Sequence, residues 1–402
     1  MAPLKPVNSY LDSIKTTIFS VMSALAVEHS AVNLGQGFPD DEGPDAMKEK
    51  AAAALYDHNN QYPPYAGVAE LKQAVARHSE RYSGIPVDAA TETLVTVGAS
   101  EALTCAFLGL VNRGDEVILF DPQYDLYAPA ATFAGAVIRT VQLDPNDWSV
   151  PHAAMEAAFS ERTKLVLINS PHNPTGKVFS DEDLAFIAGL CVKHNTYAVC
   201  DEVYEHLVFE GSHHRSLRTF PGMADRAVRV GSAGKTFSFT AWKIGWVTGP
   251  ARLVTAVAKA HQFVTFTVAS SLQRAVAYGL DHEVAFYTGL GKMLEGKRAY
   301  LERRLKEIGF QVLPAQGTYF LIADFRSLVP VDSTETDTDF SIRLTKEAGV
   351  TTIPVSAFYI SADPPRTLVR FCFCKTDDKL RQACDALESF FGKRRALQPR
   401  RS

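Results

Sequence analysis

The chain has 402 residues, of which 46% are hydrophobic and 21% charged, a composition that excludes a disordered or fibrous protein. With 41 Lys and Arg against 45 Asp and Glu, the formal net charge is −4, which argues against a nucleic-acid-binding protein. The six cysteines contain no C-x-x-C pair and no zinc-type spacing, so we expect free thiols, a reducing cytoplasmic compartment and no metal site.

The first predicted element is an apolar stretch at residues 16–27, which we expect to be a helix packed on the body of the protein, because it is too short for a membrane span. From about residue 90 to 250, β-branched runs alternate with helical patterns, which predicts a largely parallel sheet covered on both faces. These runs lie at 93–97, 116–120, 164–170, 196–202 and 227–234. One helix is predicted to begin after Ser180, its N-cap, with Leu184 and Ile187 on its apolar face.

The pattern changes after about residue 285. A charged helix that stops at Gly309 is followed by several short strands, which predict a smaller α+β lobe. The strand patterns lie at 310–314, 318–325, 350–355 and 367–374. We expect the N-terminal helix to join this lobe. We expect residues 393–402, which are basic, to form a solvated terminus, with a tail for an anionic partner as the alternative.

Four polar clusters follow predicted strands, at the edge where open α/β sheets bind ligands. After the first strand, Gly98-Ala99-Ser100 begins a helix whose N–H groups suit a phosphate, and a plain capped turn is the alternative. After the third strand, a Pro-Thr-Gly turn leaves the amide of Asn173 able to donate and accept hydrogen bonds, with an ordinary loop asparagine as the alternative.

The other two clusters carry charge. Asp201 ends an apolar strand, where a carboxylate is costly unless a cation, a helix cap or a ligand pairs with it. Lys235 and Lys243 follow the next strand, and a partly desolvated lysine can become a nucleophile, although a solvated lysine remains the alternative for each. Together the clusters suit a ligand with a phosphate, a protonated ring nitrogen, a phenolic oxygen and an aldehyde, the groups of pyridoxal 5′-phosphate.

Seven strings in the chain resemble, in order, those of the class I pyridoxal-phosphate-dependent aminotransferases. They are NLGQGFPD (33–40), NSPHNPTG (169–176), CDEVYEH (200–206), SAGKTFS (232–238), TAWKIGW (240–246), IPVSAFY (353–359) and RFCF (370–373). The likeness is greatest to the branch of kynurenine and methionine aminotransferases. It implies an α/β protein of fold type I, with a mostly parallel seven-stranded sheet in a large cofactor-binding domain (46–285) and a smaller α+β domain (1–45 and 286–402).

The resemblance also implies roles for residues around the cofactor ring. Lys235 is the lysine that forms the Schiff base with the cofactor aldehyde and, once freed, moves the proton at the substrate Cα. Asp201 keeps the ring nitrogen protonated, and Tyr204 and Asn173 hydrogen-bond the ring oxygen. Tyr124 stacks on the ring, with a core aromatic as the alternative.

By the same resemblance, the cofactor phosphate is bound by the N–H groups of Ala99 and Ser100, the hydroxyl of Ser232 and the charge of Lys243. Tyr62 matches a tyrosine that reaches the phosphate of the neighbouring subunit, which implies a homodimer with shared active sites. A plain loop tyrosine is the alternative for this residue.

For the substrate, the resemblance implies that Arg370 binds the α-carboxylate as a bidentate fork, with a buried structural ion pair as the alternative. Asn173 and the backbone of Gly37 also contact the substrate. Phe19 stands where the mammalian kynurenine enzymes have tryptophan, and Phe266 precedes Thr267, which stands where they have histidine. With Tyr124, the two phenylalanines predict an apolar substrate pocket.

The implied reaction is ping-pong transfer of the amino group of an apolar or aromatic L-amino acid (methionine, kynurenine, phenylalanine or glutamine) to a 2-oxo acid. A cysteine-S-conjugate β-lyase is the alternative on the same residues. The alternative from another class is a non-catalytic, cofactor-binding regulatory protein. Such a protein needs an added DNA-binding module, and we do not expect one because only about 30 residues precede the first string.

Overall fold

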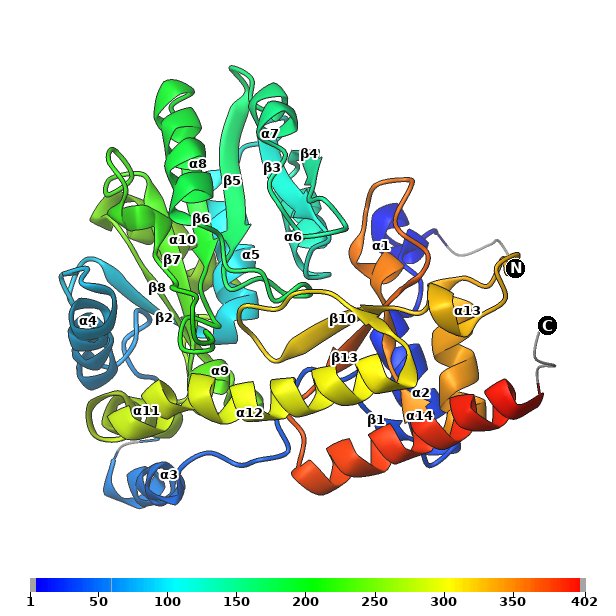
Figure 1. Cartoon of the computed structure of the whole chain (residues 1–402). Coiled ribbons are helices and arrows are strands. Elements are labelled where there is room, and N and C mark those ends of the chain that lie inside the picture. The colour runs from blue at the N-terminus through cyan, green and yellow to red at the C-terminus, as the bar shows by residue number, and fades with distance from the viewer. Residues whose placement is uncertain (1–4, 59, 398–402) are drawn as a thin grey trace.

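The computed structural model describes residues 5–58 and 60–397, and its centre is a seven-stranded sheet (Figure 1). In spatial order the strands are β2 (Thr93–Val97), β8 (Ile244–Thr248), β7 (Ala227–Ser232), β6 (Tyr197–Asp201), β5 (Thr163–Asn169), β3 (Glu116–Asp121) and β4 (Val137–Gln142). Strand β8 runs antiparallel to both of its neighbours, and the other pairs are parallel. The predicted mostly parallel sheet is therefore confirmed.

Alternate residues of the central strands point into two separate cores. Leu165 and Leu167 of β5 belong to one apolar cluster, whereas Val166 and Ile168 belong to the other. Because both faces are buried, the strand reads as an unbroken apolar run. The chain therefore needs helices on both sides of the sheet.

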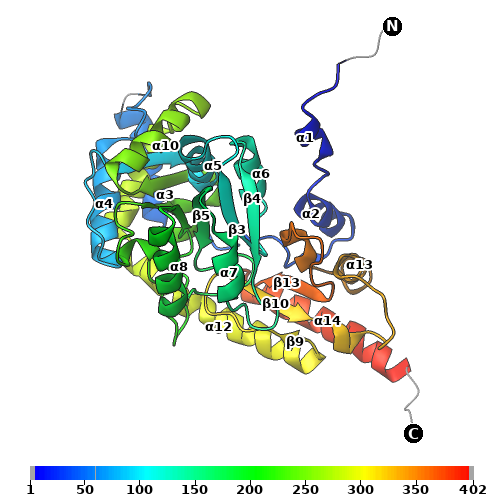
Figure 2. The same cartoon turned by 90° about the horizontal axis from the view of Figure 1, so that it is seen from above.

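Helices cover both faces, as the alternating pattern predicted (Figures 1 and 2). The larger core takes side chains from α4 (Ala69–Ser83), α5 (Gly98–Leu110), α10 (Ala251–Val264) and α11 (Ser270–His282), and α3 (Asp45–Asp57) packs on α11. The smaller core takes them from α7 (His152–Ala158) and α8 (Asp181–Lys193), while α6 (Tyr127–Phe133) lies beside α5. The predicted cap of α8 is confirmed, because Ser180 Oγ accepts the Asp183 N–H at 3.0 Å.

The C-terminal third forms the predicted smaller α+β lobe beside the sheet (Figure 2). The long helix α12 (Val284–Ile308) ends at Gly309, whose φ is 117°. An antiparallel sheet follows in the order β12 (Ile353–Pro354), β13 (Leu368–Cys372), β10 (Phe320–Asp324) and β9 (Gln311–Val312). The remaining elements are α9 (Ala233–Thr236), α13 (Asp337–Arg343), α14 (Asp377–Leu397), η1 (Leu217–Thr219), η2 (Thr240–Trp242), η3 (Arg326–Leu328), η4 (Leu344–Ala348) and η5 (Val355–Phe358).

The N-terminal segment packs on this lobe. After the short α1 (Ser9–Ser13), the predicted N-terminal helix is α2 (Ile18–Glu28), and Met22 is buried against Ile353 and Phe358. Strand β1 (Val32–Asn33) then pairs in parallel with β11 (Val350–Thr351). Helix α14 continues into the basic C-terminal stretch, of which residues 398–402 lie outside the described residues.

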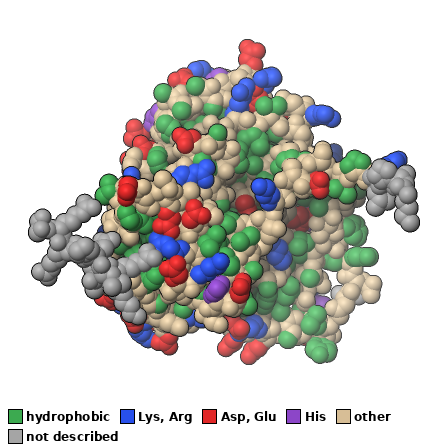
Figure 3. Space-filling view, turned by 90° about the vertical axis from the view of Figure 1, so that its right-hand side faces the viewer, with side chains coloured by type: hydrophobic (Ala, Val, Ile, Leu, Met, Phe, Trp, Pro, Cys, Tyr) green, Lys and Arg blue, Asp and Glu red, His purple; other side chains and the backbone are tan. Residues whose placement is uncertain are grey.

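The six cysteines are buried free thiols. None of the helices among the described residues is both long and apolar enough to cross a membrane. On the face shown in Figure 3, acidic and basic side chains are interspersed.

Candidate active site

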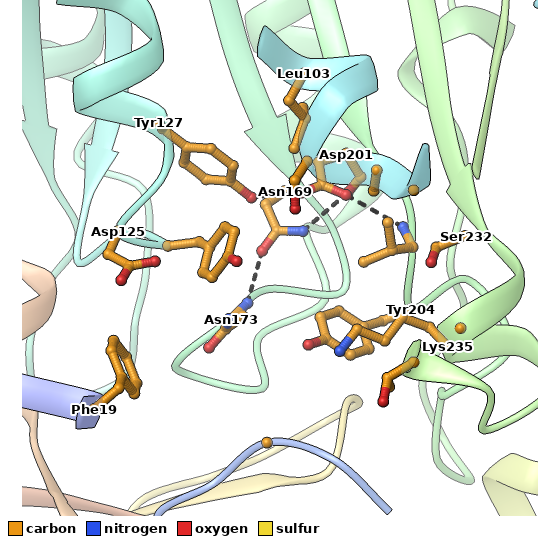
Figure 4. A pocket seen from close by; sticks show the side chains of 18 of the residues that line it. Phe19, Leu103, Asp125, Tyr127, Asn169, Asn173, Asp201, Tyr204, Ser232 and Lys235 are labelled. Carbon is orange, nitrogen blue, oxygen red and sulfur yellow. Dashed lines mark hydrogen bonds between the residues drawn. The ribbon is translucent and has the colours of Figure 1, made fainter. Parts of the chain in front are cut away.

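A cavity of about 380 Å³ opens at the carboxyl ends of the central strands (Figure 4). It is lined by Thr17, Phe19, Gln36, Gly37, Gly98, Ala99, Ser100, Leu103, Tyr124, Asp125, Tyr127, Asn169, Asn173, Asp201, Val203, Tyr204, Ser232, Gly234, Lys235, Thr240, Lys243, Phe320 and Arg370. All of the predicted site residues line it except Tyr62 and Phe266. Residues from both ends of the chain meet here because α2 and β13 face the edge of the large sheet.

One end of the cavity is an anion cradle. Helix α5 begins directly after β2 at Gly98, whose φ of 69° turns the chain and leaves the first-turn N–H groups of Ala99 and Ser100 at the cavity. A Cβ on Gly98 would lie 3.2 Å from Lys243 Nζ. Ser232, at the end of β7, completes this end. Because Lys243 forms no ion pair with any described carboxylate, the cradle suits a phosphate.

Lys235 lines the cavity from the one-turn helix α9. Its Nζ donates a hydrogen bond of 2.8 Å to the hydroxyl of Tyr319. Burial lowers the pKa of Lys235 from its ordinary value, because the protein around it disfavours the ammonium form. The lysine is therefore poised to act as a neutral nucleophile or base.

Asp201 ends β6 deep in the cavity and is 3% exposed. The Tyr127 hydroxyl donates to Asp201 Oδ2 at 2.6 Å, and Asn169 Nδ2 donates to the Asp201 backbone carbonyl at 2.9 Å (Figure 4). Burial nevertheless raises the pKa of the Asp201 carboxyl to about 6. The site thus holds a desolvated carboxylate that a protonated ring nitrogen would stabilise.

Arg370 is a buried guanidinium in the strand β13. Its Nη1 donates to Asn173 Oδ1 at 2.8 Å and its Nη2 to the Gly35 carbonyl at 2.9 Å. Among the described residues its Nε has no hydrogen-bond partner and no carboxylate forms an ion pair with it. The Phe320 ring lies 4.0 Å from the guanidinium carbon, and burial lowers the pKa of Arg370 to about 10. The alternative of a structural ion pair finds no support among the described residues, and the guanidinium is available for a carboxylate ligand.

Three aromatic residues predicted from the resemblance also line the cavity. Tyr204 is 4% exposed, and burial raises the pKa of its phenol well above the ordinary value. Tyr124 lies edge to face with Tyr127, with ring centroids 5.7 Å apart. Phe19 packs on Phe358 at 5.4 Å and forms an apolar wall opposite Lys235 (Figure 4).

Tyr62 and Phe266 do not line the cavity of the single chain. Their rings pack against each other at 5.3 Å, and the two residues are 80% and 44% exposed. Phe266 has a φ of 75°, which turns the chain after α10 and directs this segment outward. The pocket wall expected from Phe266 is therefore not formed within one chain.

Sequence reasoning missed several functional contacts. Tyr127 and Asn169 fix Asp201, Tyr319 binds Lys235, and Asp125 brings a second carboxylate to the cavity. Tyr127 lies three residues after Tyr124, and Asn169 opens the NSPHNPTG string, so their positions beside known motifs could have indicated them. Tyr319 lies in a strand-forming stretch and carried no such signal.

A second polar cluster lies behind Asp201. Among the described residues, His78, Glu205 and His206 form the one group that could hold a metal ion, and all three are buried. Arg229, however, donates to Glu205 Oε2 at 3.0 Å and to Glu202 Oε2 at 2.6 Å. The guanidinium thus already supplies the positive charge that these carboxylates need.

The chain matches the family described as "Aminotransferase class I and II" over residues 29–387, and it belongs to that family. It is therefore a pyridoxal-phosphate-dependent aminotransferase of fold type I, in the kynurenine and methionine branch. The cavity fits this cofactor, because it combines an anion cradle, a desolvated lysine and a buried carboxylate.

Several relatives carry more specific names. The chain is 46% identical to a probable N-succinyldiaminopimelate aminotransferase of Mycobacterium tuberculosis, over 93% of this chain and 96% of that protein. It is 42% identical to methionine aminotransferase of Escherichia coli (96% and 98% covered) and 38% identical to kynurenine–oxoglutarate transaminase 3 of Mus musculus (95% and 88% covered). The solved structure of N-succinyldiaminopimelate aminotransferase from Mycobacterium tuberculosis superposes with a TM-score of 0.92 at 45% identity, covering 96% of this chain and all of that one.

Proposed function

We propose that the enzyme transfers the amino group of an apolar or aromatic L-amino acid, of the methionine, kynurenine, phenylalanine or glutamine class, to a 2-oxo acid. The observation that carries this proposal is the buried Arg370, which forms no ion pair among the described residues and lines a cavity together with Phe19 and Phe320. The guanidinium binds the α-carboxylate in two parallel hydrogen bonds, and the rings receive an apolar side chain.

When bound, pyridoxal phosphate supplies an aldehyde for the amino group and a protonated ring that withdraws electrons from the substrate Cα. Lys235 would hold the aldehyde and, as a free amine, would move the proton at the substrate Cα. Asp201 would keep the ring nitrogen protonated, while Tyr204 and Asn173 would donate to the ring oxygen. Ala99, Ser100, Ser232 and Lys243 would hold the phosphate, with Tyr124 on the ring side and Gly37 on the substrate side of the cavity.

The charges of the cavity favour a donor without a side-chain carboxylate. Its described lining contains three cationic side chains, Lys235, Lys243 and Arg370, which the proposed mechanism assigns to the aldehyde, the phosphate and the α-carboxylate. Asp125 adds a carboxylate whose pKa is raised by burial. A donor with a side-chain carboxylate would therefore bring that group, desolvated, close to Asp125, and no lining cation would remain to pair with it.

The proposal is tested by measuring kcat/KM for methionine, kynurenine, phenylalanine, glutamine, glutamate and N-succinyldiaminopimelate. We expect kcat/KM for at least one of the first four donors to exceed that for the last two by about tenfold or more. A tenfold ratio corresponds to about 1.4 kcal/mol, which a desolvated carboxylate without a cationic partner would cost. A preference for either acidic donor would contradict the proposal. Pyruvate released from a cysteine S-conjugate without any 2-oxo acid, as fast as transamination, would establish the β-lyase instead.

We also propose a homodimer with shared active sites, in which Tyr62 reaches the phosphate of the partner. The exposure of the Tyr62 and Phe266 pair supports this assignment, because large aromatic side chains gather at interfaces. We further propose the division into a domain of residues 46–285 and one of 1–45 and 286–402, supported by the β1–β11 pairing. The buried free thiols support a cytoplasmic location.

Mixing two inactive variants tests the shared site. In a mixed dimer Tyr62→Ala and Lys235→Ala fall in the same active site, because Tyr62 of one subunit completes the site of the other. The second site therefore keeps both residues. Random exchange of subunits should restore about a quarter of the wild-type activity. The control is each variant unfolded and refolded alone. A mixture that gains nothing, under conditions where mass spectrometry of the intact complex shows mixed dimers, would contradict the proposal.

A further inference from the structure

Tyr319 joins two parts of the cavity lining, Lys235 and Gly37. Its hydroxyl accepts a hydrogen bond from Lys235 Nζ at 2.8 Å and donates one to the Gly37 carbonyl, also at 2.8 Å. Lys235 comes from the edge of the large sheet, and Gly37 from the loop after β1. One oxygen atom thus connects the reactive amine to the backbone beside the substrate.

The position of this hydroxyl is fixed by its surroundings. Tyr319 is 1% exposed, and its ring lies edge to face with Tyr204, with centroids 5.3 Å apart. The Thr318 N–H donates to the Leu207 carbonyl and the Phe373 N–H to the Tyr319 carbonyl, so the backbone is held from both sides. A side chain that the fold already holds in one conformation loses little further conformational entropy when it orients its partners.

The direction of the two hydrogen bonds follows from their chemistry. A phenol has one proton, and the Gly37 carbonyl can only accept, so the Tyr319 proton lies on that bond. The oxygen therefore faces Lys235 as an acceptor. Burial and the neighbouring Tyr204 raise the pKa of Tyr319 well above its ordinary value, so the phenol keeps its proton.

The backbone at Gly37 is closely packed against Phe320. A Cβ on Gly37 would lie 2.8 Å from the Phe320 ring, so a glycine is needed for the carbonyl to reach Tyr319. The Phe320 ring in turn lies 4.0 Å from the guanidinium carbon of Arg370. The hydroxyl, the carbonyl and the proposed carboxylate-binding group are therefore packed as one unit.

We propose that Tyr319 is a positioning residue for proton transfer, which holds one N–H of the freed Lys235 amine so that the nitrogen lone pair faces the substrate. This inference rests on the proposed role of Lys235. Tyr319 itself transfers no proton. Its contact with Gly37 makes the orientation of the amine depend on the loop that lies beside the substrate.

Tyr319→Phe, which removes only the oxygen, tests the proposal. We expect kcat to fall by about 10- to 100-fold, as for a misplaced catalytic group, with a smaller change in KM. The isotope effect on kcat with a Cα-deuterated donor should rise, because proton transfer becomes slower relative to the other steps. Equal kcat and an unchanged isotope effect would overturn the proposal.

A second readout uses the apoprotein and no turnover. The rate at which the apoprotein captures pyridoxal phosphate rises with pH as Lys235 loses its proton. Because the Tyr319 oxygen stabilises the ammonium form, its removal should move the midpoint of this rise to lower pH by about half a unit or more. A lowered kcat with an unmoved midpoint and isotope effect would assign Tyr319 a structural role only and overturn the proposal.

Tyr287→Phe is the matched control. Tyr287 is fully buried, and its hydroxyl accepts from Arg81 and donates to the Leu280 carbonyl, away from the cavity. It should leave the isotope effect and the capture midpoint unchanged, and thermal unfolding of both variants reports their stability. If wild-type enzyme transaminates no donor, the proposed function fails, whereas the capture midpoint still tests the contact between Tyr319 and Lys235.

Discussion

Lys235→Ala is expected to abolish transamination, with kcat lowered by about 10,000-fold or more, because the variant loses both the nucleophile and the base. The fold should persist, since the only hydrogen bond of the Lys235 amine among the described residues goes to Tyr319. The variant should still hold pyridoxal phosphate noncovalently, because the anion cradle around Ala99 and Lys243 is untouched.

Absorbance spectroscopy and single-turnover kinetics would measure both effects. The variant should show the spectrum of the free aldehyde where the wild type shows a Schiff base, and added methionine should convert the cofactor slowly or not at all. Lys243→Ala is the control, because it removes a lysine of the same cavity. It should weaken cofactor binding yet retain turnover at saturating cofactor. Transamination by Lys235→Ala at the wild-type rate would refute the assignment.

The sequence predicted those site residues whose local context is unusual. Asp201 and Lys235 are polar residues at the ends of apolar strands, where only a ligand or a partner makes burial tolerable. The two strands of the large sheet that were not predicted, β4 and β8, have weaker patterns. Strand β4 lies at the sheet edge and is largely exposed, so it lacks an apolar run. Strand β8 begins inside the TAWKIGW string, soon after the short helix η2, so no separate strand pattern marks its start.

Contacts between distant segments could not be predicted in this way. The bond from Lys235 to Tyr319 joins residues 84 positions apart, and the bond from Arg370 to Gly35 spans 335 positions. Each depends on the packing of the smaller lobe against the sheet edge, which no local pattern encodes. The same holds for Phe266, whose outward direction follows from a left-handed backbone conformation at a residue that rarely adopts one.

Asp201→Asn is expected to lower kcat/KM by about 1000-fold and yet to stabilise the apoprotein. The loss of activity follows because a neutral amide cannot hold the proton on the ring nitrogen, and the charge that develops at Cα is then poorly stabilised. The gain in stability follows because a buried carboxylate is replaced by a neutral group of the same shape. The Asn oxygen can still accept from the Tyr127 hydroxyl.

The sign of the pH dependence follows from the raised pKa. The Asp201 carboxyl has a pKa of about 6 in the folded apoprotein against 3.8 for an exposed one, so the folded state binds more protons between these values. The free energy of unfolding therefore falls as pH rises from about 4 to 6 and stays lower above that range. A shift of about two pH units corresponds to about 3 kcal/mol, which sets the upper limit of the gain at pH 7.

Urea unfolding of the two apoproteins at pH 4, 5, 6 and 7 would measure this effect, with Asp121→Asn as the control. Asp121 is also a buried carboxylate at the end of a strand, but it accepts hydrogen bonds from N–H groups of Gln123, Ile360 and Ser361. Its replacement should destabilise the protein at pH 7, because an amide nitrogen cannot accept these bonds. Asp201→Asn should do the opposite. An unchanged pH dependence in Asp201→Asn, or wild-type activity, would show that this carboxylate does not serve as the partner of a cation.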